Sequence, residues 1–75
     1  MSIQVKFFAS LREKIGLSET TIDTATTAID VWNISTKQTE LPVNLLVAIN
    51  LEYAQLDSPV EQGDEVAFFP PVTGG

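Results

Sequence analysis

The sequence ends with Gly63-Asp-Glu-Val-Ala-Phe-Phe-Pro-Pro-Val-Thr-Gly-Gly75, in which a charged turn, an apolar strand and two prolines precede a bare Gly-Gly. Side chains alternate along a strand, so Val66 and Phe68 are predicted to face the core while Phe69 points outward. Most chain ends carry no such pattern. We therefore take the terminal carboxylate of Gly75 as the candidate reactive group.

The residues after Phe69 are predicted to form an extended, flexible tail, which divides the chain into a domain of residues 1–69 and a tail of residues 70–75. Prolines fix their φ angles and lack N–H donors, so the strand must end at Pro70. Glycines have no side chain, so the tip fits a channel that any Cβ atom would block. The residues predicted to enter a partner are Pro70, Pro71, Val72, Thr73 and Gly74.

A second outward aromatic residue comes from the start of the chain. Residues 3–9 alternate with period two, and the predicted core face consists of Ile3, Val5, Phe7 and Ala9. Phe8 is therefore left on the outer face. If the first and last strands are neighbours, Phe8 and Phe69 form an aromatic patch near the root of the tail, which favours a protein interface. The alternative is that sheet twist tucks one ring under a helix or loop.

The remaining chain predicts strands grouped around one principal helix. That helix begins after Thr26 or Thr27 and buries Trp32, while β-branched residues weaken its C-terminal end. A continuous apolar run at 45–49 predicts a central strand. The other expected elements are a short helix at 10–16 capped by Ser10, a strand at 19–22, a short strand at 53–55, a turn at 62–64 and the last strand at 65–69.

These elements predict an α+β domain, in which a mixed sheet of four or five strands is covered by one main helix plus short helices. The ubiquitin-like β-grasp fold has this layout, with its first and last strands side by side and parallel in the centre.

Composition limits the chemistry of this domain. A chain of 75 residues builds one small core without a buried catalytic cleft. Cysteine and histidine are both absent, which removes thiolate nucleophiles, imidazole acid–base chemistry and Cys/His metal sites. We expect no bound metal or cofactor, and we expect catalytic side chains to come from a partner. The sequence shows neither a membrane-length apolar run nor a signal-peptide layout, so a cytoplasmic location is expected.

The net charge of −6 is unevenly distributed along the sequence. Residues 38–75 contain no base, and their acids are Glu40, Glu52, Asp57, Glu61, Asp64 and Glu65. This acidity disfavours nucleic acid as a partner and favours a protein with a basic surface, which Asp64 and Glu65 are predicted to approach. The alternative is that the acidity only aids solubility.

A terminal carboxylate is ionised and a poor electrophile at neutral pH. To react, Gly75 needs activation, most simply as an acyl-adenylate that another enzyme makes from ATP. The activated glycyl group can then accept sulfur to give a thiocarboxylate, or an amine to give an isopeptide bond.

Two stretches resemble the small subunits of molybdopterin synthases, a family of MoaD/ThiS-type sulfur carriers. They are the C-terminal run from Gly63 and the run Val5-Lys-Phe-Phe-Ala-Ser-Leu-Arg-Glu-Lys-Ile-Gly16. The resemblance implies that an adenylating enzyme related to ubiquitin-activating enzymes activates Gly75, and that a sulfur donor protein converts it to a thiocarboxylate. The tail would then enter the synthase large subunit and give its sulfur to a pyranopterin precursor, within a heterotetramer.

The resemblance further implies that this chain is the sulfur-donating subunit of a sulfurtransferase without catalytic side chains of its own. Three alternatives stay open: a carrier for another pathway such as thiazole synthesis, a protein modifier joined to lysines through Gly75, and a binding module with an inert tail.

Overall fold

The structure is a computed structural model that describes residues 2–71. The predictions for Val72, Thr73, Gly74 and Gly75 therefore fall outside the described residues. The elements in chain order are β1 (Ile3–Phe7), α1 (Ser10–Ile15), β2 (Glu19–Ile22), α2 (Ala28–Thr36), β3 (Leu46–Ile49), β4 (Glu52–Ala54) and β5 (Glu65–Phe69).

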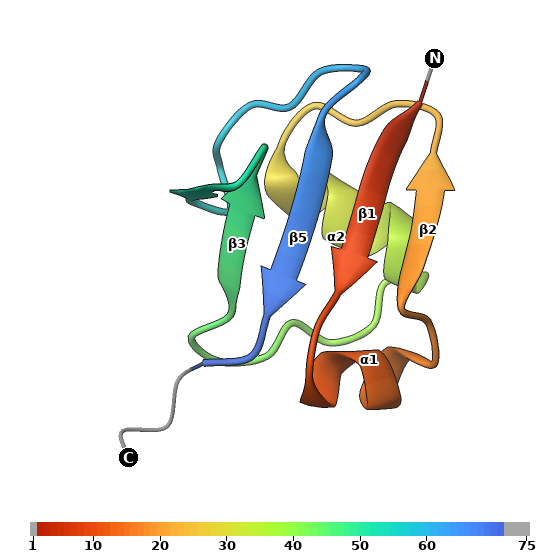
Figure 1. Cartoon of the computed structure of the whole chain (residues 1–75), viewed down its shortest axis with the longest axis vertical. Helices are drawn as coiled ribbons and strands as arrows, with labels where there is room; N and C mark the ends of the chain where they lie inside the picture. The colour runs from red at the N-terminus through yellow and green to blue at the C-terminus, as the bar shows by residue number, and fades with distance from the viewer. Residues whose placement is uncertain (1, 72–75) are drawn as a thin grey trace.

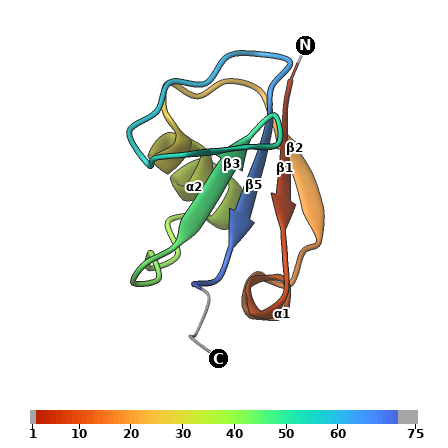
Figure 2. The same ribbon diagram turned by 60° about the vertical axis from the view of Figure 1, so that its left-hand side comes forward.

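The strands form one mixed sheet in the order β2-β1-β5-β3-β4. β1 and β5 run parallel, and the other neighbouring pairs are antiparallel. α2 crosses one face of this sheet and leaves the other face open, as two views of the chain show (Figures 1 and 2). The predicted α+β layout, with parallel first and last strands, is confirmed.

The core lies between the sheet and α2, and the central parallel pair supplies its largest part. Val5 aligns with Val66 and Phe7 with Phe68, so alternate residues of both strands point toward the helix. Trp32 of α2 is fully buried and meets Phe7 and Phe68 edge to face, with ring centroids 6.1 and 5.1 Å away. The predictions of Val66, Phe68 and Trp32 as core residues are confirmed.

α2 begins and ends with features that the sequence indicates. Thr27 precedes the helix, and both its N–H group and its hydroxyl donate to the Asp30 carboxylate, at 3.1 and 3.3 Å. At the other end the chain turns at Lys37, whose φ of 58° is left-handed. The hydroxyl of Thr36 donates to the Trp32 carbonyl at 2.7 Å, a bond that weakens the helical ladder where the helix stops.

The connection from β1 to α1 differs from the prediction. Ser10 is the first helical residue and Ala9 occupies the cap position, with φ 53° and ψ −129°, so Ser10 is not the cap. Ala9 is also exposed, and its prediction as a core residue is wrong. The reason is a tight turn, closed by a 3.1 Å bond from the Leu11 N–H to the Phe8 carbonyl, which ends the alternation of β1. Gly16 ends the helix at φ 85°, as expected.

The apolar run at 45–49, predicted as a central strand, forms β3 (Leu46–Ile49), which lies one position from the middle of the sheet. β5 holds the central position, and β3 lies between β5 and β4. β3 reads as a continuous apolar run because Val47 faces the core while Ala48, on the open face, is also almost completely buried by its neighbours. Asn50 and Leu51 connect β3 to β4, and both have positive φ angles, 53° and 71°, as a two-residue hairpin turn requires.

Candidate functional site

The open face of the sheet carries a stacked pair of aromatic rings beside the root of the tail. The rings of Phe8 and Phe69 lie with centroids 4.8 Å apart and planes 6° from parallel. Phe8 follows β1, but its N–H donates to the Phe68 carbonyl at 3.2 Å, which continues the parallel ladder by one residue. The two rings are therefore held side by side, and Phe8 keeps 39% of its surface exposed. Neither ring is tucked beneath a helix, so this geometric prediction is confirmed.

Two further apolar side chains on this face were missed by the sequence reasoning. Tyr53 of β4 is 79% exposed and its ring lies 6.5 Å from that of Phe69. Leu51, in the hairpin turn, is 88% exposed. The sequence feature that could have revealed them is the two-residue turn at Asn50-Leu51, which fixes the register of the hairpin. Leu51 is also conspicuous there, because Gly, Asn or Asp usually occupies such a turn position.

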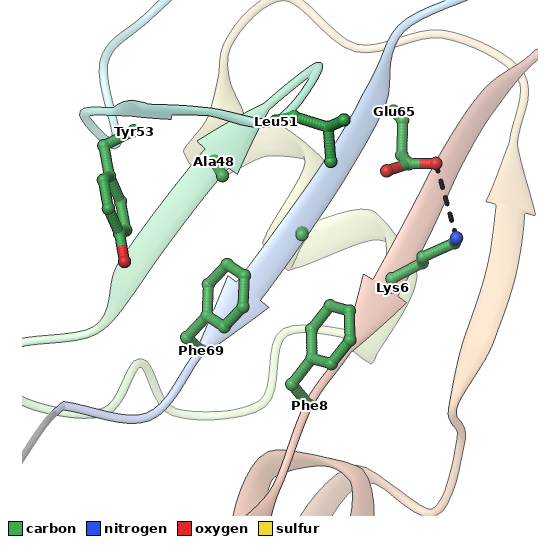
Figure 3. Close-up of a pocket in the computed structure, with 8 residues that line it drawn as sticks. Lys6, Phe8, Ala48, Leu51, Tyr53, Glu65 and Phe69 are labelled. Carbon is green, nitrogen blue, oxygen red and sulfur yellow. Dashed lines mark ion pairs between the residues drawn. The ribbon is translucent and has the colours of Figure 1, made fainter.

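Between these side chains lies a shallow hollow of about 290 Å³ (Figure 3). Its floor contains Ala48 of β3 and Ala67 of β5, which are register partners across the two strands. The surrounding side chains are Phe8, Phe69, Tyr53 and Leu51, with Lys6 and Glu65 at one end. We call this feature the alanine hollow.

A second hollow of about 370 Å³ connects this face to the tail. Phe8, Phe69 and Tyr53 line it together with Pro70 and Pro71. The structure thus brings the predicted docking residues Phe8 and Phe69 next to the first two residues of the predicted tail. Whether Pro70 and Pro71 enter a partner stays a prediction.

Asp64 and Glu65 lie away from that pair, at the opposite end of β5. The five residues of β5 separate Glu65 from Phe69 by about 13 Å at the usual strand rise. The Glu65 carboxylate pairs with the Lys6 ammonium at 3.4 Å. Asp64 accepts hydrogen bonds from the Asn50 side chain at 2.9 Å and from the Glu61 N–H at 2.8 Å. Asp64 thus has a structural role in its turn, and its predicted role toward a partner stays a prediction.

Four of the six acids in the second half of the sequence lie at the same remote end, together with Asp23 from the first half. Because β1 and β5 are parallel and β2 and β3 run against them, the sites that meet there include Asp23, Glu52, Glu61, Asp64 and Glu65. The basic residues Arg12 and Lys14 lie on α1, at the end where the tail begins (Figure 1). Glu13 of α1 and Glu19 at the start of β2 lie at that end too and offset these two cations, so the net negative charge gathers at the end of the sheet away from the tail.

A mixed five-stranded sheet with parallel first and last strands, covered on one face by α2, defines a ubiquitin-like β-grasp protein. Its open face and the root of its tail carry the exposed aromatic rings. The chain belongs to the ThiS family, whose model matches residues 5–75.

Two relatives match almost the whole chain. The molybdopterin synthase sulfur carrier subunit of Haemophilus influenzae is 40% identical, over 97% of this chain and 99% of that protein. The protein of the same name from Escherichia coli is 36% identical over the same shares of the two chains. The similarity therefore extends over nearly the full length of proteins named as sulfur carriers.

Solved structures agree with the fold. The small archaeal modifier protein 1 of Haloferax volcanii superposes with a TM-score of 0.80 at 28% identity, covering 95% of this chain and 98% of that one. A subunit in a complex of subunits 1 and 2 of the molybdopterin-converting factor from Helicobacter pylori superposes with a TM-score of 0.67 at 25% identity, with both chains fully covered. Among residues 2–71, neither helix has the length and apolar character needed to cross a bilayer.

Proposed function

We propose that this chain is the sulfur carrier subunit of a molybdopterin synthase. The observation that carries the proposal is 40% identity, over nearly the full length of both chains, to a protein named as that subunit. The stacked Phe8–Phe69 pair beside Pro70 supports it, because a carrier without catalytic side chains needs a surface that positions its tail on an enzyme.

In the proposed cycle the reacting group is the carboxylate of Gly75. An adenylating enzyme related to ubiquitin-activating enzymes joins this carboxylate to the AMP part of ATP, with release of pyrophosphate. Sulfur at the sulfide level, supplied by a donor protein, then displaces AMP and leaves a thiocarboxylate. In the proposed cycle this chain binds no cofactor of its own, ATP is consumed by the activating enzyme, and the reactions take place in the cytoplasm.

The second partner is the large subunit of the synthase. The tail from Pro70 to Gly74 delivers the thiocarboxylate into that subunit's active site, where the sulfur passes to a pyranopterin precursor. Support for such a pairing comes from the Helicobacter pylori structure, which is a complex of subunits 1 and 2 of the molybdopterin-converting factor. We expect two copies of this chain and two large subunits in the assembly.

The test is the intact mass of the chain after incubation with the activating enzyme, ATP and a sulfur source. The expected result is a mass gain equal to the exchange of one oxygen for one sulfur, lost again when the large subunit and the precursor are added. A chain lacking Gly75 is the control and should show neither change. A wild-type mass that stays constant with the activating enzyme, ATP and the sulfur source, before the large subunit is added, would refute the proposal.

A protein modifier is the second candidate function. The observation that favours it is the TM-score of 0.80 to a structure named as a small archaeal modifier. The same incubation, extended to a cell extract, separates the two functions. Lysine conjugates without any thiocarboxylate would favour the modifier, whereas sulfur transfer to a pterin favours the carrier. A carrier for thiazole synthesis would form the thiocarboxylate but would not produce molybdopterin with the large subunit.

A further inference from the structure

The floor of the alanine hollow is unusual for the middle of a sheet. Ala48 and Ala67 are register partners on adjacent strands, and they are only 7% and 6% exposed. Alanine is depleted in strands, because its methyl group packs little surface against cross-strand neighbours. Two alanines side by side leave a depression that any larger apolar pair would fill.

The walls of the hollow are large and apolar, in contrast to its floor. Phe8 and Phe69 form one side as a stacked pair, and Tyr53 and Leu51 stand on the hairpin side (Figure 3). Tyr53 and Leu51 are 79% and 88% exposed, so their apolar surface is available to an incoming group. At protein interfaces, an anchor side chain of one partner typically inserts into a depression that apolar side chains of the other partner surround.

The size of the hollow favours a protein side chain over a small molecule. Its volume of about 290 Å³ lies at or below the lower limit of roughly 300 Å³ for enclosed ligand pockets, and it is open to solvent along the sheet. The hollow also shares Phe8, Phe69 and Tyr53 with the second hollow at Pro70 and Pro71. An occupant would therefore lie in continuous contact with the root of the tail.

One end of the hollow is charged. The Lys6 ammonium and the Glu65 carboxylate pair at 3.4 Å, and their side chains are 35% and 29% exposed. Both groups keep hydrogen-bonding capacity for a partner, since the ammonium has three donors and the carboxylate two acceptor oxygens. A partner segment would therefore complement the whole site if it placed an apolar side chain in the hollow and a polar side chain next to Lys6.

We propose that the alanine hollow is a socket for one large apolar side chain, a leucine, methionine or phenylalanine, that projects from the large subunit of the synthase. This inference rests on the proposed function and adds to it the residue class by which the enzyme holds the carrier. Seating that side chain between Phe69 and Tyr53 fixes the position of Pro70, and therefore the direction in which the tail leaves the domain.

The test fills the socket without touching its walls. Ala67→Leu and Ala48→Leu each occupy the hollow from a different strand. The matched control is Thr21→Leu, which adds the same side chain to an exposed position on the open face of β2, outside the hollow. Binding to the purified large subunit is measured by titration calorimetry, and folding by thermal unfolding followed with circular dichroism.

The expected result is at least about 30-fold weaker binding for each filled variant, as for the loss of an interface anchor, with Thr21→Leu within about threefold of wild type. Tyr53→Ala and Leu51→Ala provide a second measurement at exposed positions, where the core is untouched, and each should weaken binding by about tenfold. Wild-type affinity in the filled, folded variants would overturn the socket. If a filled variant does not fold, wild-type affinity in both Tyr53→Ala and Leu51→Ala would overturn the socket equally.

Two other outcomes are distinguishable. If wild type gains sulfur and donates it to the precursor while the filled variants do so equally well, the socket is wrong and the carrier function stands. If wild type neither binds the large subunit nor gains sulfur, the carrier function itself fails, and the socket fails with it. A dimer of the isolated chain in sedimentation, abolished by Ala67→Leu, would assign the hollow to a second copy and would also overturn the proposal.

Discussion

The rings of Phe8 and Phe69 stack at 4.8 Å with their planes 6° apart, although the two residues lie at opposite ends of the sequence. The stack follows from the parallel pairing of β1 with β5, which the bond from the Phe8 N–H to the Phe68 carbonyl extends to the edge of the sheet. The predicted docking surface and the root of the predicted tail therefore both depend on one strand pairing.

The first prediction concerns the energy of this stack. Offset aromatic pairs contribute about 0.5–1.5 kcal/mol beyond the area they bury. A double-mutant cycle with Phe8→Ala and Phe69→Ala, measured by urea unfolding, should give a coupling energy in that range. Strict additivity of the two single substitutions would show that the stack contributes nothing to stability.

The second prediction concerns Phe69 as a docking residue. Phe69→Asp places a charge on the open face, so binding to the large subunit should weaken by at least about 30-fold, as at an interface hot spot. The domain should still unfold cooperatively, because the substituted side chain lies outside the core. Calorimetric titration and circular dichroism measure the two effects.

Phe68→Asp is the matched control for that substitution. Phe68 is fully buried, so the unpaired carboxylate should unfold the domain. If Phe69→Asp unfolds the domain as well, the assignment of Phe69 to a docking surface is wrong.

The third prediction concerns the strained turn before α1. At Ala9, φ 53° and ψ −129° lie in a region that glycine adopts with ease and alanine does not. Ala9→Gly should therefore raise the free energy of unfolding by about 1 kcal/mol, after allowance for the greater freedom of glycine in the unfolded chain. For a domain of this size the midpoint of thermal unfolding should rise by about 4–8 °C.

Gly16→Ala is the reciprocal experiment. Gly16 has φ 85°, and no atom lies within 4 Å of the position that a Cβ would take, so the penalty is conformational alone. A loss of about 1 kcal/mol is expected, because alanine must adopt a left-handed conformation. Opposite signs for Ala9→Gly and Gly16→Ala would support both turns, and equal signs would contradict the geometry at Ala9.

The fourth prediction concerns the loop after α2. The Trp32 indole N–H donates to the Thr39 carbonyl at 2.8 Å, which ties the loop to the core. Trp32→Phe removes this donor and leaves part of the indole space empty, so it should cost about 2–4 kcal/mol. Urea unfolding followed by circular dichroism measures the cost, because Trp32 is the only tryptophan and fluorescence is lost with it.

Thr39→Ala is the control for that loop. It removes a hydroxyl that donates to the Thr36 carbonyl at 2.8 Å but keeps the backbone acceptor for Trp32. The expected cost is about 0.5–1.5 kcal/mol, the value of one hydrogen bond. A cost equal to that of Trp32→Phe would show that the side chain of Thr39, and not the indole bond, holds the loop.

Local patterns predict most of this fold. The alternation Val5–Phe7 and Val66–Phe68 fixed the inner face of the central strands, and Thr27 marked the start of α2. Together these patterns placed Phe8 and Phe69 on the open face. Such features depend on neighbours within a few residues, which a single sequence displays.

The features that the sequence did not predict depend on contacts between distant segments. β3 was expected at the centre because its run is continuously apolar, but Ala48 is buried by side chains of other strands. The alanine hollow appears only when the register aligns Ala48 with Ala67. Likewise, the carboxylate of Asp64 accepts a hydrogen bond from the side chain of Asn50, which lies 14 residues earlier in the chain. None of these pairings can be read from spacing along the chain.

The parallel pairing of β1 with β5 also has a consequence for how the protein is made. Contacts between segments far apart in the sequence close a long loop, which costs entropy and slows folding. A chain without β5 lacks the central strand against which Val5 and Phe7 pack. Phe8 and Phe69 can therefore stack only once β1 and β5 have paired. An enzyme that recognised the stacked rings would therefore distinguish the folded domain from chains in which β1 and β5 have not yet paired.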